Sequence, residues 1–65
     1  MKFIQLTEQG GGNILINPDK IVYIQTQRYY KGKEVTRIDF GSVSYVLVKE
    51  SLEEIVEAVE TVAES

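Results

Sequence analysis

The chain has 65 residues, a formal net charge of −3, and neither cysteine nor histidine. This length gives one small domain, residues 1–65, of a size that buries only about 60% of its unfolded surface. Because disulfides and structural zinc sites are excluded, stability must come from the apolar core or from surface buried against another chain, which favours a homo-oligomer.

Before residue 50 the sequence consists of short segments rich in isoleucine, valine, tyrosine and threonine, which predict β-strands. Turn residues separate the segments, among them three glycines at 10–12 and Asn17-Pro18-Asp19. In that turn Pro18 fixes φ, and the Asn17 side chain can bond back to the backbone. The strands are expected near residues 2–7, 13–17, 20–28, 34–40 and 43–48.

Gly41-Ser42 between two apolar runs predicts a two-residue hairpin with a type II′ turn. This turn determines a register, because opposite residues share a face of the sheet. The expected pairs are Phe40–Val43, Ile38–Tyr45 and Thr36–Leu47 on the core face, and Asp39–Ser44, Arg37–Val46 and Val35–Val48 on the other. Since both faces carry apolar residues, the sheet should either curl toward a small SH3-like barrel or be covered by a neighbouring subunit.

Residues 51–64 have the pattern of an amphipathic helix. Ser51 and Glu54 have the spacing of a capping box, which begins a helix at this point. An apolar stripe follows at spacings of three and four, formed by Leu52, Ile55, Val59 and Val62. The stripe should pack on the sheet or on the same helix of a second chain. The predicted fold is therefore α+β: an antiparallel meander of four to five strands within residues 1–49, then one carboxy-terminal helix.

The charges are distributed unevenly along the chain. Residues 1–49 hold all seven lysines and arginines against four acidic residues, a net charge of +3, whereas residues 50–65 hold six glutamates and no base, a net charge of −6. The glutamates at the start of the helix interact favourably with its dipole. The others predict a solvated helix face, with an acidic docking surface as the alternative.

Catalytic chemistry is poorly represented. Without histidine or cysteine the usual general base, thiol nucleophile and soft metal ligands are missing, and no pair of carboxylates is evidently held in an apolar pocket. The glycine-rich residues 9–13 precede a strand instead of a helix, so they predict a turn and not a phosphate-binding loop. We expect no catalytic residue, metal, cofactor or small-molecule substrate.

The segment 28–33 is the clearest local indication of ligand binding. It mixes two aromatic rings with three cations, in the order Arg28, Tyr29, Tyr30, Lys31 and Lys33. Tyrosines can stack on bases while cations pair with phosphates, so the segment is a candidate nucleic-acid contact. A protein contact and a plain solvated loop are the alternatives.

Several motifs along the chain occur in a recognisable order: Leu6-Thr7, Gly10 to Gly12, Ile14-Leu15-Ile16-Asn17 with Asp19, Ile21-Val22-Tyr23-Ile24, Gly41, and Val46-Leu47-Val48-Lys49-Glu50-Ser51 running into Leu52-Glu53-Glu54-Ile55. In this order the chain resembles the small flagellar and swarming-motility proteins of the FlbD type. The resemblance implies a non-enzymatic bacterial accessory protein.

Residues 1–8 contain no apolar run of signal-peptide length, and nowhere is there a run of about 18 apolar residues that could span a membrane. We therefore expect a cytoplasmic, non-enzymatic protein-interaction or structural module that binds a protein partner or itself. The alternative is a small nucleic-acid-binding module that uses the segment 28–33.

Overall fold

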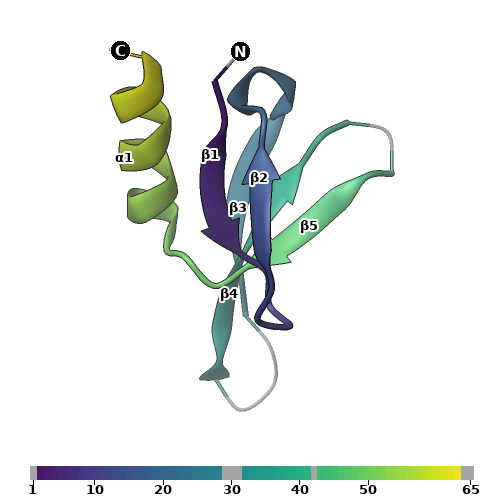
Figure 1. Cartoon of the computed structure of the whole chain (residues 1–65). Helices are drawn as coiled ribbons and strands as arrows, with labels where there is room; N and C mark the ends of the chain where they lie inside the picture. Colours follow the sequence, from purple (N-terminus) through teal and green to yellow (C-terminus); the bar gives the residue numbers. More distant parts are fainter. Residues whose placement is uncertain (1, 29–31, 42, 64–65) are drawn as a thin grey trace.

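The structure is a computed structural model that describes residues 2–28, 32–41 and 43–63. The elements in chain order are β1 (Ile4–Thr7), β2 (Asn13–Ile16), the 3-10 helix η1 (Pro18–Lys20), β3 (Tyr23–Arg28), β4 (Glu34–Asp39), β5 (Tyr45–Val48) and α1 (Leu52–Ala63). The predicted α+β fold, with the strands before a single helix, is confirmed (Figure 1).

The strands form two antiparallel sheets, β1-β2 and β3-β4-β5. The sheets meet where β1 ends, because the Lys49 amide donates to the Thr7 carbonyl at 2.8 Å and the Gln9 amide donates to the Leu47 carbonyl at 2.9 Å. The outer strands β2 and β3 do not pair with each other within the described residues, so the suggested closure into a barrel is wrong. Helix α1 contacts both β1, in the first sheet, and β3, in the second.

The first two turns, between β1 and β2 and between β2 and β3, form as their residue types predict. Between β1 and β2 the Glu8 amide donates to the Gly12 carbonyl at 2.7 Å, and Gly11 has a φ of 105°, a conformation that favours glycine. Between β2 and β3 the Asp19 amide donates to the Asn17 side-chain oxygen at 3.0 Å, and Pro18 begins η1. The predicted bond from Asn17 to the backbone is confirmed.

The register between β4 and β5 differs from the predicted one by one residue. The observed pairs are Thr36–Val48, Arg37–Leu47, Ile38–Val46 and Asp39–Tyr45. The Phe40 amide donates to the Ser44 carbonyl at 3.0 Å, so residues 41–43 separate the paired positions in place of the expected two-residue turn. The predicted register and turn are therefore wrong.

A shift of one residue turns each side chain of a strand to the opposite face. Val48 is fully buried and Val46 packs against the core, whereas Tyr45 and Val43, predicted for the core face, are 53% and 91% exposed. The observed register thus places two valines toward the core and leaves the tyrosine hydroxyl in water. Burial of apolar side chains outweighs the local preference of Gly-Ser for a two-residue turn.

The core contains residues from both sheets and from the helix. Its fully buried apolar members are Ile4, Leu6, Ile16, Ile38, Val48 and Ile55. Ile55 comes from α1, and the partly buried Val59 and Val62 of the same stripe pack against the cluster. Leu52 is half-buried and lies beside Val35 and Thr36, at the helix start. The two small sheets share a single apolar cluster, and α1 completes that cluster with Ile55. The core therefore depends on the helix.

The helix begins with the predicted capping box. The Ser51 amide donates to Glu54 Oε1 at 2.9 Å, and the Glu54 amide donates to Ser51 Oγ at 3.1 Å. These two bonds satisfy amides that have no partner within the helix.

Glu50, directly before the helix, connects three segments. Its carboxylate accepts the Thr7 amide at 2.8 Å, and its carbonyl accepts the hydroxyl of the buried Thr36 at 2.6 Å. Partial burial has the largest single effect and raises the pKa of Glu50. The hydrogen bonds from Thr7, a hydrogen bond from the backbone of Glu50 itself and the charge of Lys49 together outweigh it, and the pKa lies below its ordinary value of 4.5.

Truncation of the buried helix stripe should unfold much of the protein. We expect Ile55→Ala to cost about 2–5 kcal/mol, because Ile55 is fully buried, against a total stability of roughly 3–5 kcal/mol for a domain of this size. Leu52→Ala, at a half-buried position, should cost less, and the exposed Glu57→Ala about 0.5 kcal/mol or less. Urea unfolding followed by circular dichroism measures all three. Wild-type stability in Ile55→Ala would contradict the assignment of the buried face.

The Glu50 carboxylate should make the folded state sensitive to acid. A carboxyl group whose pKa is lowered on folding contributes stability that is fully present above its ordinary value of 4.5 and lost as the pH falls through the lower folded-state pKa. The free energy of unfolding of Glu50→Gln should therefore fall less on acidification than that of the wild type. Urea titrations across this range, with the exposed Glu57→Gln as control, measure the difference. Parallel profiles for wild type and Glu50→Gln would exclude this role.

Candidate interaction surfaces

The outward face of the three-stranded sheet carries two tyrosines and an arginine. Ile38 points into the core, so strand alternation puts its neighbours Arg37 and Asp39 on the opposite face. Tyr23 of β3 and Tyr45 of β5 pair with Asp39 from either side. These four residues, Tyr23, Arg37, Asp39 and Tyr45, form what we call the tyrosine–arginine face.

Arg37 is held in place by two neighbours on this face. Its Nε donates to Asp39 Oδ2 at 3.0 Å and its Nη2 donates to Asp39 Oδ1 at 3.2 Å, while its guanidinium lies 4.0 Å from the centre of the Tyr45 ring. The hydrogen bonds to Asp39 raise the pKa of Arg37 above its ordinary value. The Asp39 side chain is only 9% exposed, so Arg37 neutralises a charge that would otherwise be largely removed from water.

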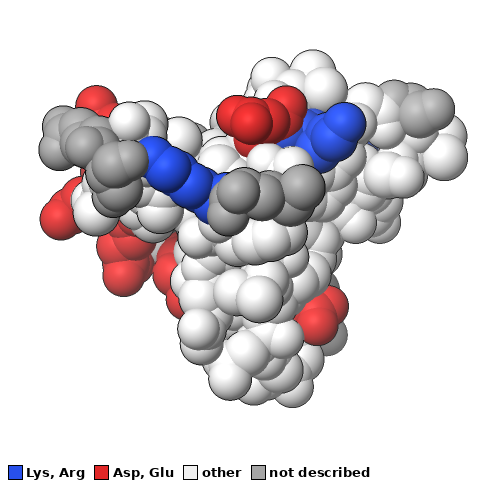
Figure 2. Space-filling model, turned by 45° about the horizontal axis from the view of Figure 1, so that its top comes forward, with Lys and Arg blue, Asp and Glu red and all other residues white. Residues whose placement is uncertain are grey.

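Further apolar surface lies at the same end of the sheet. Tyr23 and Tyr45 are 50% and 53% exposed, Val22 directly before β3 is 62% exposed, and Val43 stands in the loop before β5. Contiguous apolar surface rimmed by polar groups is typical of protein contact sites. Several acidic side chains, by contrast, gather on the side of the molecule where α1 lies, at the left of Figure 2, although others appear at its top centre and lower right.

The predicted basic and aromatic segment is only partly described. Arg28 ends β3, and its Nη2 lies 2.9 Å from Glu34 Oε2 across the strand pair, with both side chains exposed. Lys33 is exposed. Tyr29, Tyr30 and Lys31 lie outside the described residues. Arg28 is therefore already paired with a carboxylate, which weakens its attraction for phosphates.

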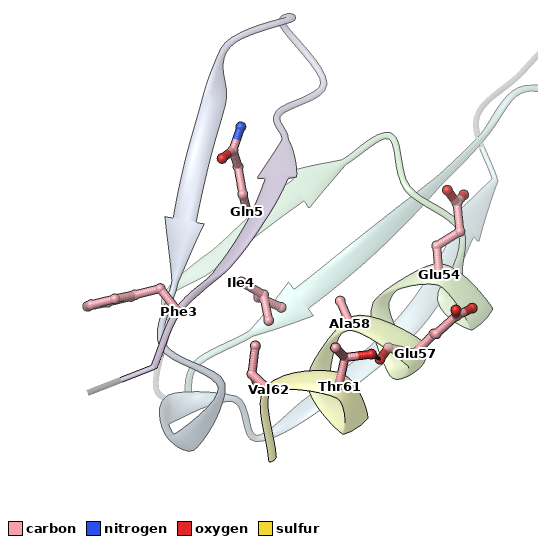
Figure 3. A pocket seen from close by; sticks show the side chains of 8 residues that line it. All are labelled: Phe3, Ile4, Gln5, Glu54, Glu57, Ala58, Thr61 and Val62. Atoms are coloured by element: carbon pink, nitrogen blue, oxygen red, sulfur yellow. Dashed lines mark hydrogen bonds between the residues drawn. The ribbon is translucent and has the colours of Figure 1, made fainter. Parts of the chain in front are cut away.

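A groove separates α1 from β1 (Figure 3). Ile4 from β1 and Ala58 and Val62 from α1 point toward one another across it. Phe3 and Gln5 line the strand side, and Glu54, Glu57 and Thr61 line the helix side. The groove thus has an apolar floor and an acidic rim.

A second groove lies between α1 and the start of β3. It is lined by Pro18, Ile21, Ile24, Val56, Val59 and Glu60. Val56 of α1 lines this groove and remains 42% exposed. The helix therefore has an apolar depression on each side.

The described residues contain no group of three or more acidic side chains arranged to hold a metal ion. Hydrogen bonds within the fold help to raise the pKa of Arg37 and to lower that of Glu50. Neither group resembles a general acid or base in a cleft. In this part of the chain, no helix is long and apolar enough to cross a membrane.

Comparisons with protein-family models, with curated proteins and with solved structures gave no match. The resemblance to the FlbD-type motility proteins stays a prediction from the sequence motifs.

Sequence reasoning missed the tyrosine–arginine face. In the predicted register Tyr45 belonged to the core face, and Arg37 stood opposite Val46 on the other side of the sheet. Tyr45 could have been placed beside Asp39 had the β4–β5 pairing been shifted by one residue, whereas the position of Tyr23 beside Asp39 depends on the separate β3–β4 register. The residues of this face were visible in the sequence, but placing Tyr45 on it depended on the length of the loop between β4 and β5.

Proposed function

We propose that this protein is a non-enzymatic protein-interaction module that binds a second copy of itself through the tyrosine–arginine face. The observation that carries the proposal is the position of Arg37, which Asp39 and Tyr45 hold on an exposed face bordered by two half-exposed tyrosines. Tyrosine and arginine are the residue types, with tryptophan, that contribute most to protein interfaces.

The geometry also favours binding on entropic grounds. A free arginine loses rotamer freedom when it enters an interface, whereas Arg37 is already oriented by two hydrogen bonds and one ring contact. Tyr23 and Tyr45 present large rings with few rotatable bonds. When a partner covers this face, these side chains therefore lose little conformational entropy, and the entropic cost of binding is small.

The exposed surface supports self-association. The chain exposes 4688 Å², whereas a compact monomer of its 7.4 kDa mass is expected to expose roughly 4,200 Å². Its small apolar core and its lack of disulfides also favour burial of further surface against another chain.

Electrostatics favours this face over the helix as the self-contact. Two copies of a chain with a charge of −3 repel each other, most strongly where the glutamates of α1 would meet. On the tyrosine–arginine face Arg37 and Asp39 cancel, so two such faces can meet without opposing like charges. For the cellular role, the motif resemblance alone is the support, and it favours a bacterial accessory protein related to motility.

A charge placed on the tyrosine–arginine face should prevent self-association. The wild type should sediment with a mass that rises toward the dimer as concentration increases, and its melting temperature should rise with it. Tyr23→Glu should remain a monomer, because two carboxylates would meet across the contact. Leu15→Glu is the matched control, since Leu15 is an equally exposed apolar residue on β2 of the other sheet.

Sedimentation equilibrium over a wide concentration range measures the masses. A monomeric wild type at every concentration, or an equal loss of association in Leu15→Glu, would contradict the proposed contact.

Nucleic-acid binding is the second candidate, because exposed tyrosines and an arginine on a sheet face can stack on unpaired bases. The charges argue against it: Arg28 and Arg37 are each paired with a carboxylate, and the chain is acidic overall. We expect no change in the fluorescence anisotropy of a labelled single-stranded oligonucleotide at low salt. Binding that weakens steeply with salt and is lost in Tyr29→Ala/Tyr30→Ala would favour this candidate instead.

A further inference from the structure

Among the described residues, strand β1 has a strand partner along its whole length on one side only. β2 pairs with it from Ile4 to Thr7. On its other side β5 reaches only the end of β1, through the bridge between Glu8 and Val48 and the bond from the Lys49 amide to the Thr7 carbonyl. Beside the first half of β1 lies α1 instead (Figure 1).

The hydrogen bonds at the end of β1 show which backbone groups face the helix. In an antiparallel strand the N–H and C=O groups of successive residues point to alternate sides. The Glu8 amide donates toward β2, to Gly12, whereas both backbone groups of Thr7 bond on the opposite side, to Lys49 and to the Glu50 carboxylate. By the same alternation the N–H and C=O of Gln5 point away from β2, toward α1.

The ladder between β1 and β5 ends because of Glu50 and Ser51. The Glu50 carboxylate takes the Thr7 amide, which a longer β5 would have bonded with its backbone. The capping box at Ser51 then turns the chain into the helix. The position that a continued β5 would occupy beside Phe3 and Gln5 is the groove of Figure 3.

The side chains around this strand edge indicate what could occupy it. Ile4, Ala58 and Val62 offer an apolar floor, and Glu57 offers an exposed carboxylate at the rim. Glu54 adds negative charge, although it also accepts the Ser51 amide. None of the residues that line the groove is a lysine or arginine, so its charge is complementary to a basic partner.

We propose that the open edge of β1 is a β-augmentation site for an extended segment of a partner protein in which apolar and basic side chains alternate. The segment lies antiparallel to β1, in line with β5, and its backbone bonds the N–H and C=O of Gln5. Its apolar side chains face α1 and rest on Ala58 and Val62 beside the buried Ile4, while its basic side chains leave the opposite face of the segment and are attracted by the exposed Glu57 carboxylate at the rim. This site shares no residue with the tyrosine–arginine face, so either proposal can fail alone.

A peptide titration followed by NMR tests the site. The probe is a short synthetic peptide in which valine alternates with lysine, added to the ¹⁵N-labelled full chain. We expect the largest amide shifts at Phe3 and Gln5 and slower hydrogen exchange of the Gln5 amide, because the peptide backbone accepts its proton. Binding should weaken as salt is added, since the contact to Glu57 is screened.

Matched variants separate the groove from general electrostatics. Glu57→Gln should weaken binding about two- to fivefold, as expected for loss of one exposed ion pair. Glu60→Gln also removes one negative charge from α1, but beside the other groove, and should weaken peptide binding less. Thr61→Arg, an exposed change on the rim, should weaken binding most, because it adds both bulk and a like charge.

Three results would overturn the proposal: equal binding of a peptide in which glutamate replaces lysine, shifts confined to the tyrosine–arginine face, or no shifts at all. Shifts at Phe3 and Gln5 that appear with rising protein concentration alone would assign the edge to a second copy of the chain. Unchanged exchange at Gln5 despite binding would show that the peptide does not extend the sheet.

Discussion

The structure depends on how the chain leaves β5 and enters α1. At this point Glu50 bonds β1 through its carboxylate and β4 through its carbonyl, and Ser51 begins the helix one residue later. These bonds fix the point at which α1 begins, and the buried Ile55 with Val59 and Val62 then packs the helix onto the shared core. The same bonds end the pairing of β1 with β5 and so create the groove beside β1. One connection therefore determines both the stability of the domain and the shape of its acidic side.

The two candidate surfaces differ in the balance of their charges. On the tyrosine–arginine face a buried aspartate holds an arginine, and the charges cancel in place. On the helix side the glutamates have no basic partner from α1 and stay solvated. A neutral face suits association between identical chains, whereas an acidic groove repels a second copy and attracts a basic segment. The two surfaces share no residue, so the two proposals concern separate parts of the domain.

The sequence predicted the elements well because each rested on a local signal. The capping box at Ser51 and Glu54, the glycines at 10–12 and the bond from Asn17 each act over a few residues, and the structure contains all of them. The β4–β5 register was wrong because Gly41-Ser42 has a local preference for a two-residue turn that the core overrides. The tyrosine–arginine face was lost with it, since its members come together only in the observed pairing.

The sequence by itself determined the α+β class, the order of strands and helix, the position where the helix starts and the separation of its acidic side from its apolar side. These properties follow from residue type and spacing over a turn or two. Only the tertiary structure decided that the sheet stays open, which residues of β5 face the core, and that half of β1 faces a groove. Those outcomes depend on contacts between residues distant in the chain, such as Thr7 with Glu50 and Ile38 with Val46, whose partners no local pattern specifies.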